Sequence, residues 1–168
     1  MGLDLIDYDL LLIVVYRPPS NTLADNVALL DRLESLCHGR EVLVVGDFNL
    51  PNIKWNSLNH QVGLCFPERE FFNLFTSLGL HQFVTESTFI YSDNTLDLVL
   101  SSEGDCVNNL NLLPPFPRCG HLLVVFDYLY QHLASSSTLT ALAKPNVRIW
   151  SRANFDAINR ELGTAGGL

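Results

Sequence analysis

Apolar residues along the chain fall into short continuous runs that alternate with stretches of helical spacing. The runs at 10–15 and 41–45 are rich in β-branched residues, which predicts strands that are buried on both faces. Further strands are predicted at 82–84, 88–91, 95–100 and 122–126. In the 95–100 strand the three leucines share one face, so Asp97 is expected to point away from the leucine core.

Two stretches carry apolar residues at helical spacing. Thr22 and Asp25 form a capping-box pattern at the start of the first helix, and Gly39 suits its end. Its predicted apolar face consists of Val27, Leu30, Leu33 and Cys37. Pro67 and Glu68 suit the first turn of the second helix. Its apolar stripe is Phe71, Leu74, Phe75 and Leu78, with Gly79 just beyond.

The order of these elements predicts an α/β fold with a mixed sheet, because several connections are too short for parallel crossovers. Residues 108–117 read as a loop. The composition changes after Tyr130, so we expect one domain over 1–130, a linker over 131–147 and a connector helix over 148–168.

The 168 residues are 48% hydrophobic and 17% charged, which suits one packed domain and excludes a chain that is disordered throughout. No apolar run approaches the roughly 20 residues of a membrane span, and the acidic flanks of the first run do not suit a signal peptide. We therefore expect a soluble intracellular protein, cytoplasmic or nuclear, without a membrane partner. The four cysteines have no metal-site spacing and are expected to be reduced.

The net charge of −8 argues against a broad basic face for nucleic acid. This objection weakens where a divalent metal lies between protein carboxylates and phosphate, because the metal then supplies the positive charge.

One motif places an acid and an amide where a buried strand ends. Gly46-Asp47-Phe48-Asn49 follows the 41–45 strand directly. Hydrolysis of a phosphodiester needs an activated water and hydrogen-bond donors for the transition state, and Asp47 and Asn49 can fill these two roles. The alternative is a tight turn, which the same residues also favour.

Two further candidate groups follow the same logic. Asp97 could fix the tautomer of His121 and stabilise its cationic form, but it could equally cap a turn or pair with a buried arginine. Tyr16 and Arg17 could donate to phosphate oxygens from a stiff Pro-Pro loop. Taken alone, that loop is better explained as the end of a strand.

Together and in order, four motifs resemble the endonuclease/exonuclease/phosphatase family. They are Val15-Tyr-Arg-Pro-Pro-Ser20, Val45-Gly-Asp-Phe-Asn-Leu-Pro51, Thr95-Leu-Asp-Leu-Val-Leu-Ser101 and Phe116-Pro-Arg-Cys-Gly-His-Leu122. The first two, with Ile53 and Trp55 beyond them, are most similar to the endonuclease of LINE-type (non-LTR) retroelement polyproteins. The resemblance covers about residues 10–130, and the 148–168 segment is similar to the connector that leads to a reverse transcriptase.

The resemblance implies part, mainly the C-terminal half, of a four-layer α/β sandwich of the deoxyribonuclease I-like type. It implies DNA as substrate, Mg²⁺ or Mn²⁺ as cofactor and a reverse transcriptase domain in the parent polyprotein. By the same resemblance, Tyr16 and Arg17 bind phosphate, Asp47 and Asn49 activate or orient the water, and Asp97 orients His121, which polarises the phosphate.

Two departures from the family pattern bear on activity. The glutamate that holds the metal in the family belongs to a motif before the tyrosine, and only fifteen residues precede Tyr16. Gly120 also stands where the family has an aspartate. We therefore expect a truncated copy with weak activity or none.

Three functional hypotheses follow. The first is a metal-dependent DNA endonuclease that nicks a strand to prime reverse transcription. The second is a non-catalytic remnant that acts as a binding or interaction module. The third is a relative of phosphatases or sphingomyelinases, which the similarity of the motif sequences to those of retroelements disfavours.

Overall fold

The structure is a computed structural model that describes the backbone of residues 2–5 and all of residues 10–55 and 63–130. Contacts within the chain divide it into two units, Met1–Leu133 and Ala134–Leu168. Every described residue belongs to the first unit. The predicted linker and connector helix lie outside the described residues.

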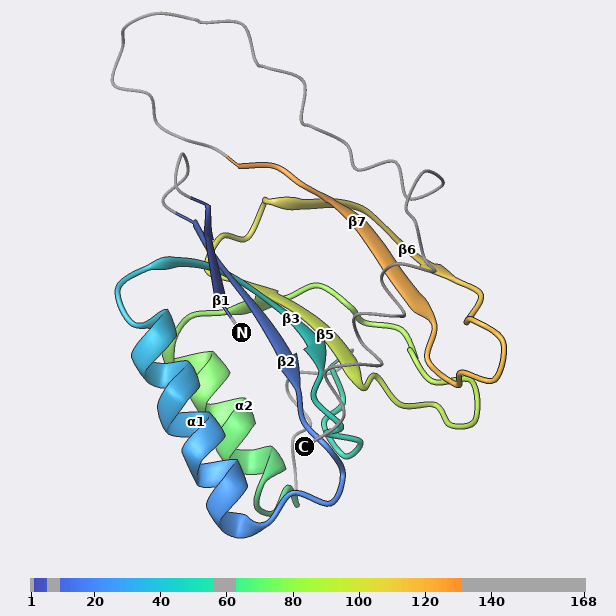
Figure 1. The fold of residues 1–168 in the computed structure, drawn as a ribbon, viewed down its shortest axis with the longest axis horizontal. Helices are drawn as coiled ribbons and strands as arrows, with labels where there is room; N and C mark the ends of the chain where they lie inside the picture. Colours follow the sequence, from blue (N-terminus) through green and yellow to red (C-terminus); the bar gives the residue numbers. More distant parts are fainter. Residues whose placement is uncertain (1, 6–9, 56–62, 131–168) are drawn as a thin grey trace, which may run out of the picture. The chain divides into compact units, whose positions relative to one another are not determined.

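A five-stranded mixed sheet forms the centre of the first unit (Figure 1), in the order β1 (Gly2–Leu5), β2 (Leu10–Tyr16), β3 (Glu41–Asp47), β5 (Asp97–Ser101) and β4 (His81–Gln82). Strands β2 and β3 are parallel, and the other neighbours are antiparallel. The mixed sheet predicted from the short connections is confirmed.

Two helices cover one face of this sheet: α1 (Leu23–Cys37) and α2 (Glu68–Ser77). The helix α1 begins with the predicted capping box, in which the Thr22 hydroxyl accepts from the Asp25 amide and the Asp25 carboxylate accepts from the Thr22 amide. Between helices and sheet lies a core whose largest members are aromatic, and Phe48 packs edge-on against Phe71 and Phe75.

The apolar face predicted for α1 is wrong at one position. Val27 is 43% exposed, and the side chains buried on this helix are Asn26, Leu33 and Cys37. The inward position next to Val27 is occupied by Asn26, whose side-chain oxygen accepts a hydrogen bond from the buried Arg17. A polar residue at a core position is invisible to a search for apolar periodicity.

A second sheet packs on the opposite face and consists of β6 (Val107–Leu113) and β7 (Leu123–Tyr128). Its inward side chains, among them Leu110, Val124 and Phe126, cover Leu43 and Val99 of the first sheet. Figure 1 shows the β6–β7 sheet and the two helices on opposite sides of the five-stranded sheet. This arrangement, with α/β layers and facing sheets, agrees with the expected sandwich fold.

The loop predicted for 108–117 is wrong over most of its length, because β6 occupies Val107–Leu113. The pairing with β7 shifts register between Asn108 and Asn111, and Asn109 has a positive φ of 50°. This bulge lets Val107 and Leu110 share the inward face although their spacing is odd. The alternation that would have identified the strand is therefore broken in the sequence.

The short strands were predicted with the wrong extent. Strand β4 covers only His81–Gln82, and residues 88–91 contribute one isolated bridge, between Phe89 and His121. Strand β5 begins at Asp97, and both of its faces are buried: Leu98 and Leu100 lie in the helix-side core and Val99 in the other. Asp97 shares the face of Val99 at the strand's first residue.

In the part of the chain that the structure describes, no helix is long and apolar enough to cross a bilayer.

Candidate active site

Strand register brings three candidate residues to one edge of the central sheet. Asp47 is the last residue of β3, and its partners are Tyr16, the last residue of β2, and Asp97, the first residue of β5. The phenol of Tyr16 and the carboxylates of Asp47 and Asp97 therefore lie on three neighbouring strands, β2, β3 and β5. These residues are 31 and 50 positions apart, and only the sheet places them together.

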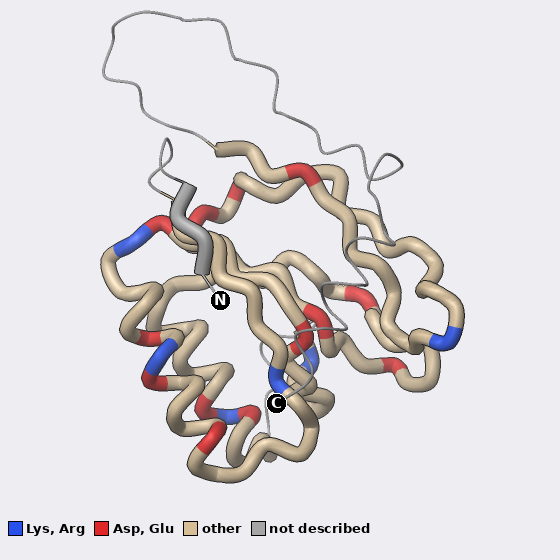
Figure 2. Tube along the Cα trace, in the orientation of Figure 1, with Lys and Arg blue, Asp and Glu red and all other residues tan. Residues whose placement is uncertain are grey.

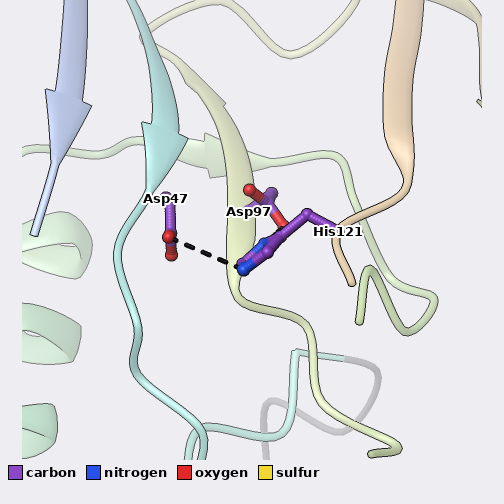
Figure 3. Close-up of side chains that lie close together, drawn as sticks. All are labelled: Asp47, Asp97 and His121. Atoms are coloured by element: carbon purple, nitrogen blue, oxygen red, sulfur yellow. Dashed lines mark hydrogen bonds and ion pairs between the residues drawn. The ribbon is translucent and has the colours of Figure 1, made fainter. Parts of the chain in front are cut away.

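His121 reaches the same edge from the segment that leads into the second sheet. It lies just before β7, and its bridge to Phe89 fixes the backbone. Its Nδ1 atom is 2.8 Å from an Asp97 carboxylate oxygen, and its Nε2 atom is 3.9 Å from Asp47 Oδ2. In Figure 3 the imidazole extends between the two aspartates, and its far edge faces Asp47. The structure therefore brings Asp47, Asp97 and His121 into one cluster.

The surroundings of Asp47 favour its protonated form. Burial raises the pKa of its carboxyl above the ordinary value of 3.8, and the nearby Asp97 raises it further. His121 and the hydrogen bonds from Asn49 act in the opposite direction but are smaller. A carboxyl with a raised pKa is a better proton acceptor once it is ionised, which suits a group that activates water.

Asn49 holds both oxygens of Asp47. Its backbone amide donates to Asp47 Oδ1 at 3.1 Å, and its side-chain Nδ2 donates to Asp47 Oδ2 at 3.0 Å. Asn49 adopts a φ of 48°, a left-handed conformation that asparagine tolerates well. The motif thus forms a tight Asx turn and also orients a carboxylate, so the two interpretations of this motif are compatible.

Gly46 permits this turn because the backbone leaves no room for a side chain. Its φ is +143°, and a Cβ atom there would lie 1.8 Å from the carbonyl oxygen of Val15. The glycine of the motif is therefore required by the close approach of β2 and β3.

Tyr16 and Arg17, the predicted phosphate ligands, point in different directions. Tyr16 is 71% exposed at the sheet edge next to Asp47, where its hydroxyl is available to a ligand. Arg17 is only 4% exposed, and its guanidinium donates into the protein, to Asn26, Phe48 and Asn49. The structure brings Arg17 next to the site but turns its charged group away from solvent.

Comparison with known proteins agrees with this geometry. The profile of a family described as endonuclease-reverse transcriptase matches residues 10–116, well over half of the chain. The chain belongs to this family. The match includes Tyr16, Asp47, Asn49 and Asp97 but ends before His121, whose assignment to the site rests on the geometry above. Among curated proteins no match is found.

Solved structures show the same fold as this member of the endonuclease-reverse transcriptase family. The endonuclease domain of TRAS1, a telomere-specific non-LTR retrotransposon, is 18% identical with a TM-score of 0.59, over 78% of this chain and 61% of that one. The 3′ phosphatase NExo (D146N) from Neisseria, bound to a product DNA hairpin, is 13% identical with a TM-score of 0.54, over 73% and 62%. The fold is thus deoxyribonuclease I-like, and the chain spans about three fifths of either structure.

Gly120 is surrounded by aromatic rings in this family member. An ideal Cβ atom there would lie 2.5 Å from Phe89 Cε2 and 2.9 Å from Tyr91 Cε2. The ring of Phe89 also lies against His121, with 4.9 Å between ring centroids. Aromatic rings therefore occupy the space that a side chain at position 120 would need.

The donor set of the cluster suits a divalent cation. Asp47, Asp97 and His121 each offer one ligand atom, and these atoms lie within 4.8 Å of one another. Carboxylate oxygens are the ligands that Mg²⁺ and Mn²⁺ prefer, and a cation would relieve the repulsion between Asp47 and Asp97. Because Mg²⁺ and Mn²⁺ prefer oxygen ligands, the two carboxylates suit them better than the imidazole does.

The lysines and arginines of the described residues do not form one broad basic patch. In the view of Figure 2, the lysines and arginines of the described residues are scattered among acidic ones. This distribution agrees with the net charge of −8.

Sequence reasoning missed two buried polar residues that support the site. Thr88 is fully buried, and its hydroxyl oxygen accepts hydrogen bonds from the backbone amides of Leu96 and Asp97, at 2.9 and 3.0 Å. Asn26 is 3% exposed and accepts from Arg17. Neither residue stands in a recognisable motif, so only their contacts reveal them.

Proposed function

We propose that this chain carries catalytic residues of a divalent-metal-dependent DNA endonuclease, which hydrolyses a phosphodiester bond. The observation that carries the proposal is the Asp97–His121 pair at 2.8 Å, which presents the free edge of the imidazole to Asp47. The family name and the fold support the same conclusion.

In the proposed reaction, the carboxylate of Asp47 orients the attacking water and accepts its proton. Asn49 keeps that carboxylate in place by donating to both of its oxygens. The raised pKa of Asp47 supports this role, because proton acceptance is most efficient when the pKa of the base approaches the working pH.

His121 is proposed to polarise the phosphate. Asp97 accepts from Nδ1–H and fixes the orientation of the ring, so that a protonated imidazole would donate from Nε2–H to a non-bridging oxygen. Tyr16, exposed beside Asp47, would donate its hydroxyl to the same phosphate. A Mg²⁺ or Mn²⁺ ion held by Asp47 and Asp97 would offset charge on the leaving oxygen.

The biological setting is proposed from the family description and from the fold neighbour. The substrate would be DNA, and a reverse transcriptase domain of the same polyprotein would extend the nicked strand. Such a reaction belongs inside the cell, in the cytoplasm or nucleus. We expect the chain by itself to be weakly active, because Gly120 and its aromatic neighbours take the place of one acidic residue.

A plasmid-nicking assay with Mg²⁺ tests the proposal. Single-strand nicks should appear with the wild-type chain and disappear with Asp47→Asn and His121→Ala. Matched controls are Asp31→Asn on the exposed face of α1 and His81→Ala on β4, at the opposite end of β5 from Asp97. Nicking that survives both site variants would overturn the mechanism. A wild-type chain that binds DNA without nicking it would favour the binding-module hypothesis.

A further inference from the structure

We propose that Arg17 is a positioning residue that holds the Asp47–Asn49 turn in its working geometry, rather than a ligand for phosphate. This inference rests on the proposed function, because the turn it holds is the one that orients the attacking water. It changes the role that the family resemblance implied for Arg17.

The guanidinium of Arg17 is bonded to two separate parts of the protein. Its Nε atom donates to Asn26 Oδ1 at 2.7 Å, and its Nη1 atom donates to the carbonyl oxygens of Phe48 and Asn49 at 3.2 and 2.9 Å. Asn26 is itself held, since its Nδ2 donates to the Thr22 carbonyl in the first turn of α1. Arg17 thus connects the turn to a fixed point on a helix.

The backbone of Arg17 holds the same turn from the other side. Its amide donates to the carbonyl of Asp47 at 2.8 Å, and its carbonyl accepts from Asn49 Nδ2 at 3.2 Å. That Asn49 nitrogen also donates to Asp47 Oδ2. The position of the Asp47 carboxylate therefore depends on Asn49, and the position of Asn49 depends on Arg17.

Burial makes this arrangement difficult to combine with phosphate binding. With 4% of its surface exposed, Arg17 offers little of its guanidinium to a phosphate, and its Nε and Nη1 donors are already used by Asn26 and two carbonyl oxygens. The buried cation is compensated locally, since it lies near the buried carboxylate of Glu68 and over the ring of Phe71 at 5.9 Å. Tyr16, at 71% exposure, is the neighbour that solvent and substrate can reach.

Arginine is the residue suited to this role. Its planar group offers several donors in a fixed fork, which matches an amide oxygen on one side and two carbonyl oxygens on the other. Lysine carries the same charge but offers its donors from one atom, so it cannot span both sides. The proposal therefore predicts that charge alone does not rescue Arg17.

The test compares Arg17→Met and Arg17→Lys with the control Arg69→Met, which alters an exposed arginine on α2. Hydrogen–deuterium exchange is measured on peptides that contain residues 46–50, together with kcat and KM for plasmid nicking. We expect both Arg17 variants to exchange about tenfold faster in 46–50, with little change in β6 and β7. The kcat should fall about 10- to 100-fold with an unchanged KM, since small displacements at a site cost about this much.

Two results would overturn the proposal. One is unchanged exchange in 46–50 together with a raised KM in Arg17→Met. The other is a KM and kcat close to wild type in Arg17→Lys, as expected for a simple phosphate contact. If Arg17 variants do not fold, Asn26→Leu replaces them, because it removes one acceptor of the guanidinium. The same peptide should then exchange faster, and unchanged exchange would contradict the role.

The exchange measurement needs no catalytic activity. A wild-type chain that fails to nick DNA would therefore end the proposed function, while the effect of Arg17 on the turn would still be decided by the exchange rates.

Discussion

The Nδ1 atom of His121 lies 2.8 Å from a carboxylate oxygen of Asp97, although Asp97 begins β5 of the central sheet and His121 precedes β7 of the second sheet. This bond orients the imidazole and leaves Nε2 directed toward Asp47. In the absence of the carboxylate, neither the tautomer nor the ring orientation would be set.

Replacement of Asp97 should therefore reduce activity through His121. We expect Asp97→Asn to lower kcat for nicking by about 10² to 10⁴, the range for loss of an oriented acid–base group. The ¹⁵N chemical shifts of the His121 ring should report the changed tautomer. Asp31→Asn serves as the control, and unchanged ring shifts in Asp97→Asn would contradict the assigned role.

The pKa of Asp47 should respond to its two charged neighbours in opposite directions. Asp97→Asn should lower the Asp47 pKa toward 3.8 by removing a like charge, and His121→Ala should raise it by removing a stabilising group. The carboxyl ¹³C shift of Asp47, followed against pH in protein treated with a chelator, measures both effects. Shifts in the same direction would refute this electrostatic account.

The raised pKa of Asp47 also has a consequence for stability. The folded state binds this proton more tightly than the unfolded chain, so the group stabilises the fold in full below pH 3.8. The contribution is lost as the pH rises through the folded-state pKa. We expect the pH dependence of the free energy of unfolding to lose this component in Asp47→Asn, measured by urea denaturation at several pH values.

Thr88 should be needed for its hydroxyl rather than for its size. Thr88→Val leaves two buried amides, those of Leu96 and Asp97, without their acceptor, at a cost of about 1–3 kcal/mol for each unsatisfied group. Thr88→Ser retains the acceptor and should be closer to wild type. Urea denaturation of the pair measures the difference, and equal stability would show that these hydrogen bonds contribute little.

Gly120 should not tolerate a side chain while Phe89 is present. Gly120→Ala forces a Cβ atom against the Phe89 ring, and overpacking of this kind costs about 1–3 kcal/mol. Gly120→Asp, which introduces the acid that the family resemblance implies, should lower stability and activity for the same steric reason. Phe89→Leu should partly rescue Gly120→Ala in a double-mutant cycle. Additive effects of the two substitutions would exclude the proposed steric coupling.

Local patterns were sufficient for a large part of the fold. The runs at 10–15 and 41–45 form β2 and β3, and the capping box of Thr22 and Asp25 starts α1, because these features depend on residues that are near in sequence. The motif at Asp47 was recognisable for the same reason, since a polar group directly after a buried strand must lie at a sheet edge.

Where residues meet across the fold, only the tertiary structure could decide. The bulge in β6 hides its alternation, and Asn26 replaces an apolar residue on α1. Arg17 looks like a phosphate ligand in its motif, yet its guanidinium bonds a carbonyl 32 residues away. The sequence by itself determined the fold class and which residue types form the candidate site. Contacts between distant segments decided the direction of each side chain, because burial and hydrogen bonding act on neighbours in space.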